Sequence, residues 1–259
     1  MASDAALRLL EDRYQATANA LAARTSEQVA TLWANLGGVN DTAMARFSAA
    51  AAQVVEASKR QAVALADGYV RTYIALAESS GVPASTIDVA AIAAEARAGV
   101  SALDVYRRPV VTARAALANG RSFADALRLA RVRATSAANT DVHLASRAGA
   151  DASMRANGVE HYRRVPDATA CTFCLVASTQ RYRTGQLMPL HAHCGCSVAP
   201  LVGTRDRVVD QALLGRLKAA SDRPDYWNDR KIAVHHHGEL GPVLTRAGDH
   251  FTGPAGLAA

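Results

Sequence analysis

LWANLGGVNDTAMARF, residues 32–47 of this 259-residue chain, separates two long segments that share one pattern. Large apolar residues recur every three or four positions over residues 7–36 and again over 44–76. This spacing places them on one face of an α-helix. The two glycines interrupt the first helix, and Asn40 or Asp41 can cap the second. We therefore expect two long amphipathic helices that pair as an antiparallel hairpin.

Further helices follow this hairpin. Helical patterns cover roughly 87–98 and 101–119, and a longer one begins at Phe123 and stops at Gly158, a residue type that often ends helices. We expect the longer segment to form two helices that meet near 139–141. Half of the residues are hydrophobic but only 5% are aromatic, and alanine dominates, which favours helices packed through small side chains. The sequence thus predicts a mainly α protein.

The chain changes character after these helical segments. VEHYRRVPD, residues 159–167, alternates β-branched and aromatic residues with arginines as a short strand does, and QRYRTG and CSVAPLV further along predict two more strands. An amphipathic helix is expected over 206–221, followed by strand and turn. We therefore expect three regions: an α-helical docking region over 1–157, a small β-rich α+β module over 158–204, and a helix with an extended tail over 205–259.

CTFCLVASTQRYRTGQLMPLHAHCGC, residues 171–196, contains every cysteine of the chain. Its C-x2-C turn can direct two thiolates at one tetrahedral ion, and its H-x2-C-x-C end offers three further ligands. A closed zinc site takes four protein ligands, so the sequence leaves open which residue of the second half stays outside, and whether His193 points away or replaces a ligand. The candidate zinc ligands are Cys171, Cys174, His191, Cys194 and Cys196.

Other chemistry can use the same residues. Two disulfides, free thiols or a redox pair are disfavoured by the expected cytoplasmic synthesis and by the lack of a βαβ pattern. A catalytic zinc is disfavoured because neither an H-x-E before the C-x-x-C nor an H-E-x-x-H occurs. A structural Zn²⁺ is favoured, since a module of about 40 residues with few aromatics buries little, whereas zinc binding contributes on the order of 10 kcal/mol. We expect no catalytic residues and no enzyme activity.

Charge is unevenly distributed along the chain. Residues 101–200 contain 13 arginines against 6 acidic residues, a net charge of +7, whereas 1–100 carries −2 and 201–259 carries +1. Contact with nucleic acid and pairing with acidic residues of a protein partner both remain open. Three adjacent histidines at 235–237 are expected on a solvated or interface strand rather than at a second metal site. The contact candidates are Arg128, Arg131, Arg163, Arg164, Arg181 and Arg183.

The first residues, MASDAALRLLEDRY, carry acids where a secretory signal has a basic segment followed by an apolar run. No later apolar stretch approaches membrane-spanning length. We therefore expect a protein that is made in a cytoplasm and has no membrane partner.

Taken together, YRRVPDATACTFCLVASTQRYRTG leading to HAHCGC resembles the phage Mu protein F-like head morphogenesis family, whose pattern is a C-x-x-C after a short strand and a later H-x-x-C-x-C. The resemblance covers about residues 123–202, and HGELGPVL followed by FTGP is similar to tail segments of actinobacterial phage relatives. It maps the family motif onto the five candidate ligands, while His193 stands where many relatives have Asn.

This resemblance implies a minor capsid protein of a tailed phage, made in the host cytoplasm and incorporated near the portal vertex or inside the virion head, in multiple copies. The implied partners are the portal protein, the major capsid protein or both, with packaged double-stranded DNA as a further candidate. Two rival functions are weighed against it. One is a nucleic-acid-binding zinc protein, recognised by a steep salt dependence of binding. The other is a zinc hydrolase or nuclease with a water-filled position beside Glu160 or Asp167.

Overall fold

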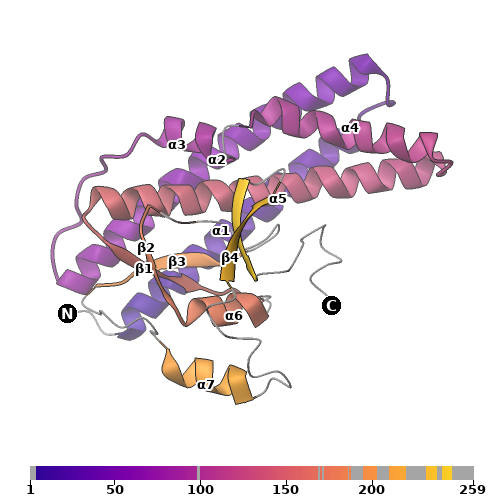
Figure 1. Cartoon of the computed structure of the whole chain (residues 1–259). Helices are drawn as coiled ribbons and strands as arrows, with labels where there is room; N and C mark the ends of the chain where they lie inside the picture. The colour runs from indigo at the N-terminus through magenta and orange to yellow at the C-terminus, as the bar shows by residue number, and fades with distance from the viewer. Residues whose placement is uncertain are drawn as a thin grey trace.

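The computed structural model describes most of the chain. A long helical body carries a small antiparallel sheet on one side (Figure 1). Among the described residues, no helix combines the length and apolar character needed to cross a membrane. The described residues are 4–97, 100–168, 170, 172–185, 187, 195–202, 210–219, 232–237 and 241–246.

The predicted hairpin is confirmed by the first two helices, α1 (Asp4–Ala34) and α2 (Asp41–Glu78), which pack along each other. The turn between them uses Gly37 with φ 71°, a left-handed conformation that favours glycine. Asn40 caps α2 by accepting a hydrogen bond from a backbone N–H of its first turn. The apolar periodicity therefore predicted both helices, and Asn40, one of the two expected capping residues, marks where the second begins.

Three more helices complete the body: α3 (Val89–Glu95), α4 (Ala102–Ala118) and α5 (Phe123–Ala156). The expectation that residues 123–157 form two helices is wrong, because α5 is continuous. Near the expected break, the Asp141 side chain is buried and bonds to neighbouring elements instead of capping its own backbone. As predicted, the helix stops at Gly158, which has a φ of 72°.

Gly149 lies where α5 crosses α2. A Cβ at this position would come within 2.8 Å of the Cα of Val63 and 2.9 Å of its carbonyl oxygen, so the two backbones touch here through the missing side chain. The remaining interface is also built from small buried residues, including Ala62 and Ala145. Glycine thus sets the distance between the two longest helices of the body.

We expect Gly149→Ala to lower the free energy of unfolding by about 1–3 kcal/mol, because the added methyl group forces the helices apart. Gly68→Ala on α2 is the matched control. A Cβ there meets nothing within 4 Å, so alanine is expected to raise the free energy of unfolding by about 0.5–1 kcal/mol. Urea denaturation of both variants measures the difference. Equal effects would show that no close crossing exists at Gly149.

The sheet has the strand order β2-β1-β3, with both pairs antiparallel. Its strands are β1 (His161–Val165), β2 (Arg181–Arg183) and β3 (Ser197–Pro200), and the short helix α6 (Thr172–Ser178) packs against β1. The three strands predicted for this module are therefore confirmed. Further along lie α7 (Gln211–Ala219) and an antiparallel pair, β4 (Ile232–His237) and β5 (Gly241–Arg246).

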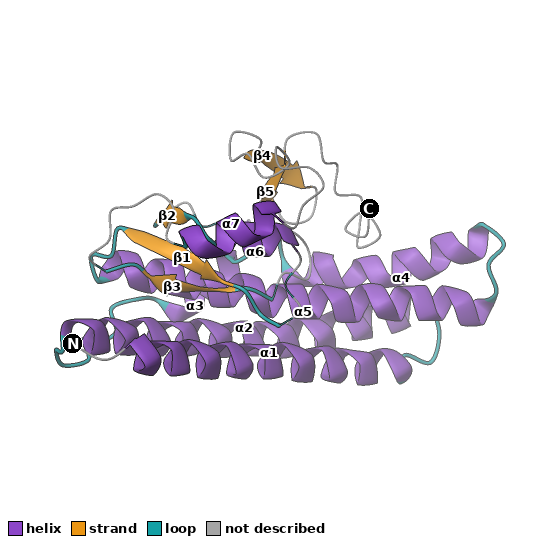
Figure 2. Ribbon diagram, turned by 90° about the horizontal axis from the view of Figure 1, so that it is seen from below, coloured by secondary structure: helices purple, strands orange, loops and turns teal. Residues whose placement is uncertain are grey.

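The sheet and the helical body share one hydrophobic core. Tyr69 and Val70 of α2 pack in the same cluster as Tyr162 of β1 and Val198 of β3. Figure 2 shows the sheet lying against the layer formed by α1, α2 and α5. An ion pair also joins the two parts, since one guanidinium nitrogen of Arg163 lies 2.6 Å and 2.7 Å from the two carboxylate oxygens of Glu11. The expected division at residue 157 stays a prediction, and the packing across it is continuous.

Candidate metal centre and contact surfaces

The structure brings together one cysteine from each half of the predicted zinc motif. Cys174 lies in α6 and Cys196 directly precedes β3, and their exposed fractions are 1% and 2%. Both belong to one buried cluster with Ala177, against which Tyr182 of β2 packs. The other candidate ligands, Cys171, His191 and Cys194, lie outside the described residues, as does His193.

The donor set fits a zinc ion as far as the described residues allow. Two cysteine thiols lie in one buried cluster, and thiolates are preferred ligands of Zn²⁺. Among the described residues no group of three His, Cys, Asp or Glu side chains could by itself hold a metal. A complete site therefore needs ligands from Cys171, His191 or Cys194, as the motif requires.

Two residues that the motif analysis missed hold the second half of the motif against the helical body. The side-chain amide of Gln15 on α1 donates to the Gly195 carbonyl oxygen at 2.6 Å and accepts from the Ser197 N–H at 3.0 Å. Arg147 on α5 donates to the Cys196 carbonyl oxygen at 3.3 Å. The backbone on both sides of the Cys196 thiol is thus bonded to helices far away in the sequence.

Gly195 fits tightly between these groups. A Cβ on this residue would overlap the Oδ2 atom of Asp167 and would lie 3.7 Å from the Oδ1 atom of Asn19. Asp167 therefore packs against the second half of the motif, whereas the side chain of Glu160, the other carboxylate considered for a hydrolase, is 81% exposed. Of these two carboxylates, Asp167 is the one that contacts the described part of the cysteine motif.

Buried positive charge also lies at the thiol cluster. Arg147 has an exposed fraction of 5%, and Arg164 one of 0%. The guanidinium carbon of Arg164 lies 5.3 Å from the centre of the Tyr182 ring, the same ring that packs against Cys174. Burial raises the pKa of Tyr182, and its hydroxyl donates to the Ala177 carbonyl oxygen at 2.9 Å. Cations at this position would favour the negative charge of thiolates if the two cysteines held a metal ion.

The six candidate contact arginines do not share one surface. The expectation that Arg164 lines a contact surface is wrong, because it points into the core, and Arg163 is bound to Glu11. Arg181 is half-buried and Arg183 exposed on β2, while Arg128 and Arg131 are exposed in the first turns of α5. In Figure 1 the start of α5 and the sheet lie toward opposite ends of the helical body.

The three histidines at 235–237 lie on β4, as expected for a strand.

Exposed apolar residues lie near Arg128 and Arg131 of α5. Leu129 is 38% exposed and Val132 is 59% exposed. Helical periodicity places Val132 on the side of α5 opposite its buried Ala126, Ala130 and Ala134, with Arg128 and Arg131 on one side of Val132 and Leu129 on the other. We call Arg128, Leu129, Arg131 and Val132 the outer face of α5. This face combines positive charge with apolar area, as protein docking surfaces do.

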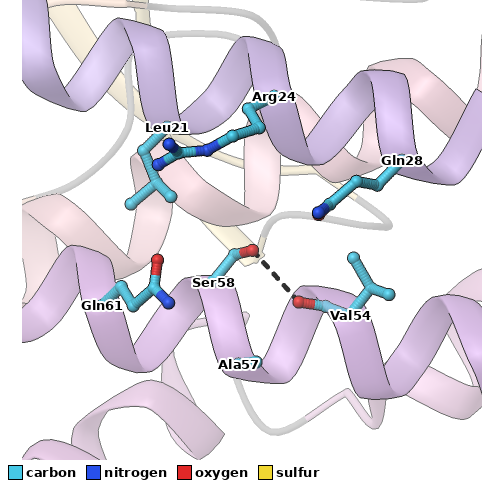
Figure 3. Close-up of a pocket in the computed structure, with 7 residues that line it drawn as sticks. All are labelled: Leu21, Arg24, Gln28, Val54, Ala57, Ser58 and Gln61. Atoms are coloured by element: carbon cyan, nitrogen blue, oxygen red, sulfur yellow. Dashed lines mark hydrogen bonds between the residues drawn. The ribbon is translucent and has the colours of Figure 1, made fainter.

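A shallow pocket of about 350 Å³ lies between α1 and α2 (Figure 3). Arg24 is the one charged residue among those that line it, and the Ser58 hydroxyl donates to the Val54 carbonyl oxygen at 3.1 Å. It contains none of the candidate metal ligands. The lining residues are Leu21, Arg24, Gln28, Val54, Ala57, Ser58 and Gln61.

Comparison with known protein families shows where the chain belongs. The family model described as VG15 protein matches residues 8–214, which include the helical body, the sheet and both halves of the cysteine motif. Neither the curated proteins nor the solved structures contain a significant match. This match supports a viral origin and does not name the Mu protein F-like family. The chain belongs to the VG15 protein family, a phage-related family.

Proposed function

We propose that the chain is a minor capsid protein of a tailed phage, which acts in head morphogenesis at the portal vertex and has a structural zinc site. The observation that carries the proposal is the burial of Cys174 and Cys196 in one cluster, in a chain of a phage-related family. The motif resemblance to Mu protein F-like head proteins supplies the assembly role. The proposed role is structural, and no reaction is assigned to the site.

The zinc ion would be held by four of Cys171, Cys174, His191, Cys194 and Cys196. It would supply a cross-link between α6 and the segment that leads into β3. Arg147 would offset the charge of the thiolates, and Asp167 would pack beside Gly195 as an outer neighbour of the site. A closed site of this kind stabilises the fold and leaves no position for a substrate.

The outer face of α5 is the docking surface that the described residues support best. Its exposed Val132 and Leu129 gain nothing from a phosphate backbone, but they can enter an apolar pocket of a partner protein. Arg128 and Arg131 then match acidic residues at the rim of such a pocket. These features favour the portal protein or the major capsid protein over packaged DNA as the partner at this face.

Co-expression with the portal and major capsid proteins of the same phage tests the proposed function. We expect the chain to sediment with portal rings or procapsids, and Val132→Glu to reduce the bound amount at least about tenfold, as a charge in a desolvated contact does. The matched control is Val82→Glu, because Val82 is 57% exposed in the loop after α2, and it should bind like the unchanged chain.

Two outcomes would overturn the proposal. The chain could stay in the supernatant while portal rings and shells assemble without it, which removes the capsid role. Alternatively, it could bind double-stranded DNA with a steep loss of affinity between low and high salt and ignore both capsid proteins, which favours the nucleic-acid-binding function.

A further inference from the structure

We infer that Gln15 is a positioning residue of the zinc site, because its side-chain amide holds the cysteine-bearing segment 195–197 in the conformation that metal binding needs. The inference rests on the proposed zinc site. Gln15 lies on α1, about 180 positions away from the residues it holds, and belongs to no recognisable metal motif.

Both N–H donors of the Gln15 side-chain amide are used. Its Nε2 donates to the Gly195 carbonyl oxygen and to Asn19 Oδ1 at 3.0 Å, while its Oε1 accepts from the Ser197 N–H. A side-chain amide has two N–H donors and one acceptor oxygen, so both donors of Gln15 are bonded. The side chain is 8% exposed, and its removal would leave buried backbone groups without these partners.

The two bonds to segment 195–197 have the pattern of a neighbouring parallel strand. Such a strand bonds a carbonyl at one position and the N–H two positions later on the same edge. Ser197 is the first residue of β3 and pairs with Val165 at the end of β1, so Gln15 holds the chain where the cysteine segment enters the sheet. A single side chain of α1 therefore fixes the chain at the start of β3.

Cys196 lies between the two bonded groups. Gly195 is held on one side and Ser197 on the other, and the carbonyl oxygen of Cys196 itself accepts from Arg147. These contacts fix the backbone from which the Cys196 thiol projects, before any metal binds. Residues that orient ligands in this way typically change metal affinity by about 10- to 100-fold when they are replaced.

The test compares full-length wild-type protein with Gln15→Leu, which keeps the size of the side chain and removes both bonds. Zinc content, zinc affinity by chelator competition and the absorption spectrum of the Co²⁺-substituted protein are measured under reducing conditions. Hydrogen exchange of the Ser197 amide in metal-free protein reports the hydrogen bond itself. Gln28→Leu is the control, because Gln28 lies on the same helix and lines the pocket between α1 and α2.

We expect about one zinc per wild-type chain, an affinity at least about tenfold lower in Gln15→Leu, an altered Co²⁺ spectrum and faster exchange at Ser197. Gln28→Leu should match wild type in all four measurements. If Gln15→Leu binds zinc as tightly as wild type, the inference is overturned while the zinc site stands. If wild-type protein binds no zinc, the zinc site itself fails, and the inference falls with it.

Discussion

Replacing Asp141 with alanine is expected to lower the free energy of unfolding by about 3–5 kcal/mol, the usual cost of removing one partner of a buried ion pair. Asp141 accepts from Arg97 Nε at 2.5 Å and from the Tyr106 hydroxyl at 2.8 Å, and both charged residues are 3% exposed. The alanine variant leaves a buried guanidinium without its carboxylate. The variant also loses the hydrogen bonds that link α5 to α3 and α4, because Arg97 follows α3 and Tyr106 lies in α4.

Chemical denaturation of three variants separates the buried charge from its packing. Arg107→Ala removes an exposed ion pair with Asp104 and is expected to change the free energy of unfolding by less than about 1 kcal/mol. The double variant Arg97→Met with Asp141→Leu replaces both charges by apolar groups and should recover most of the loss. A double variant that is as unstable as Asp141→Ala would show that shape, and not the unpaired charge, determines the effect.

The hydrogen bonds of Asp141 also explain why the predicted helix break near 139–141 was wrong. Polar residues at 139–141 looked like the end of one helix and the cap of another, because Asn, Thr and Asp compete for backbone hydrogen bonds in turns. Asp141 instead bonds to Arg97, 44 positions earlier in the chain, and α5 continues unbroken. The hairpin, the cap of α2 and the stop at Gly158 were predictable from sequence. They depend on the apolar periodicity, on a capping side chain and on a glycine, all of which are local features. The Arg97–Asp141 contact depends on tertiary packing, which no local pattern contains.

The candidate site was predictable to a similar extent. Spacing alone identified the cysteine motif, whereas Gln15 could be noticed only as a polar residue next to Tyr14 on the apolar face of α1. The error at Arg164 was avoidable. Successive residues of a strand face opposite sides, so two adjacent arginines in β1 cannot both reach one surface, and the buried Tyr162 two positions earlier marks the inner side.

A second large effect is expected at high pH. Burial is the main cause that raises the pKa of every tyrosine among the described residues, and it raises the pKa of Tyr14 to about 12. Tyr14 stacks on Tyr69 with ring centres 4.0 Å apart, and its hydroxyl lies 2.6 Å from that of Ser146. This tyrosine cluster is part of the core that joins the helices to the sheet.

The free energy of unfolding falls at high pH because tyrosines of the unfolded chain ionise at lower pH than the buried tyrosines of the folded protein. A phenol whose pKa is raised by folding stays neutral in the folded protein, while the unfolded chain begins to ionise near pH 10. The contribution of Tyr14 is therefore fully present below pH 10 and is lost between pH 10 and about pH 12, at a cost of roughly 2–3 kcal/mol. Burial also raises the pKa values of Tyr69 and Tyr106 well above their usual value, so these two residues add to the loss.

We expect the free energy of unfolding, measured with urea from pH 8 to pH 12, to fall steeply above pH 10. The six tyrosines of the described residues should ionise mainly as the protein unfolds, which tyrosine absorbance follows. Tyr14→Phe is the informative variant, because it keeps the ring in the stack and removes one ionisable group. It should be less stable than wild type at pH 8 by about 1 kcal/mol, through the lost hydrogen bond to Ser146, yet lose less stability above pH 10. If the variant falls with pH as steeply as wild type, Tyr14 ionises freely in the folded state, and the stacked tyrosines are open to solvent rather than sealed between helices and sheet.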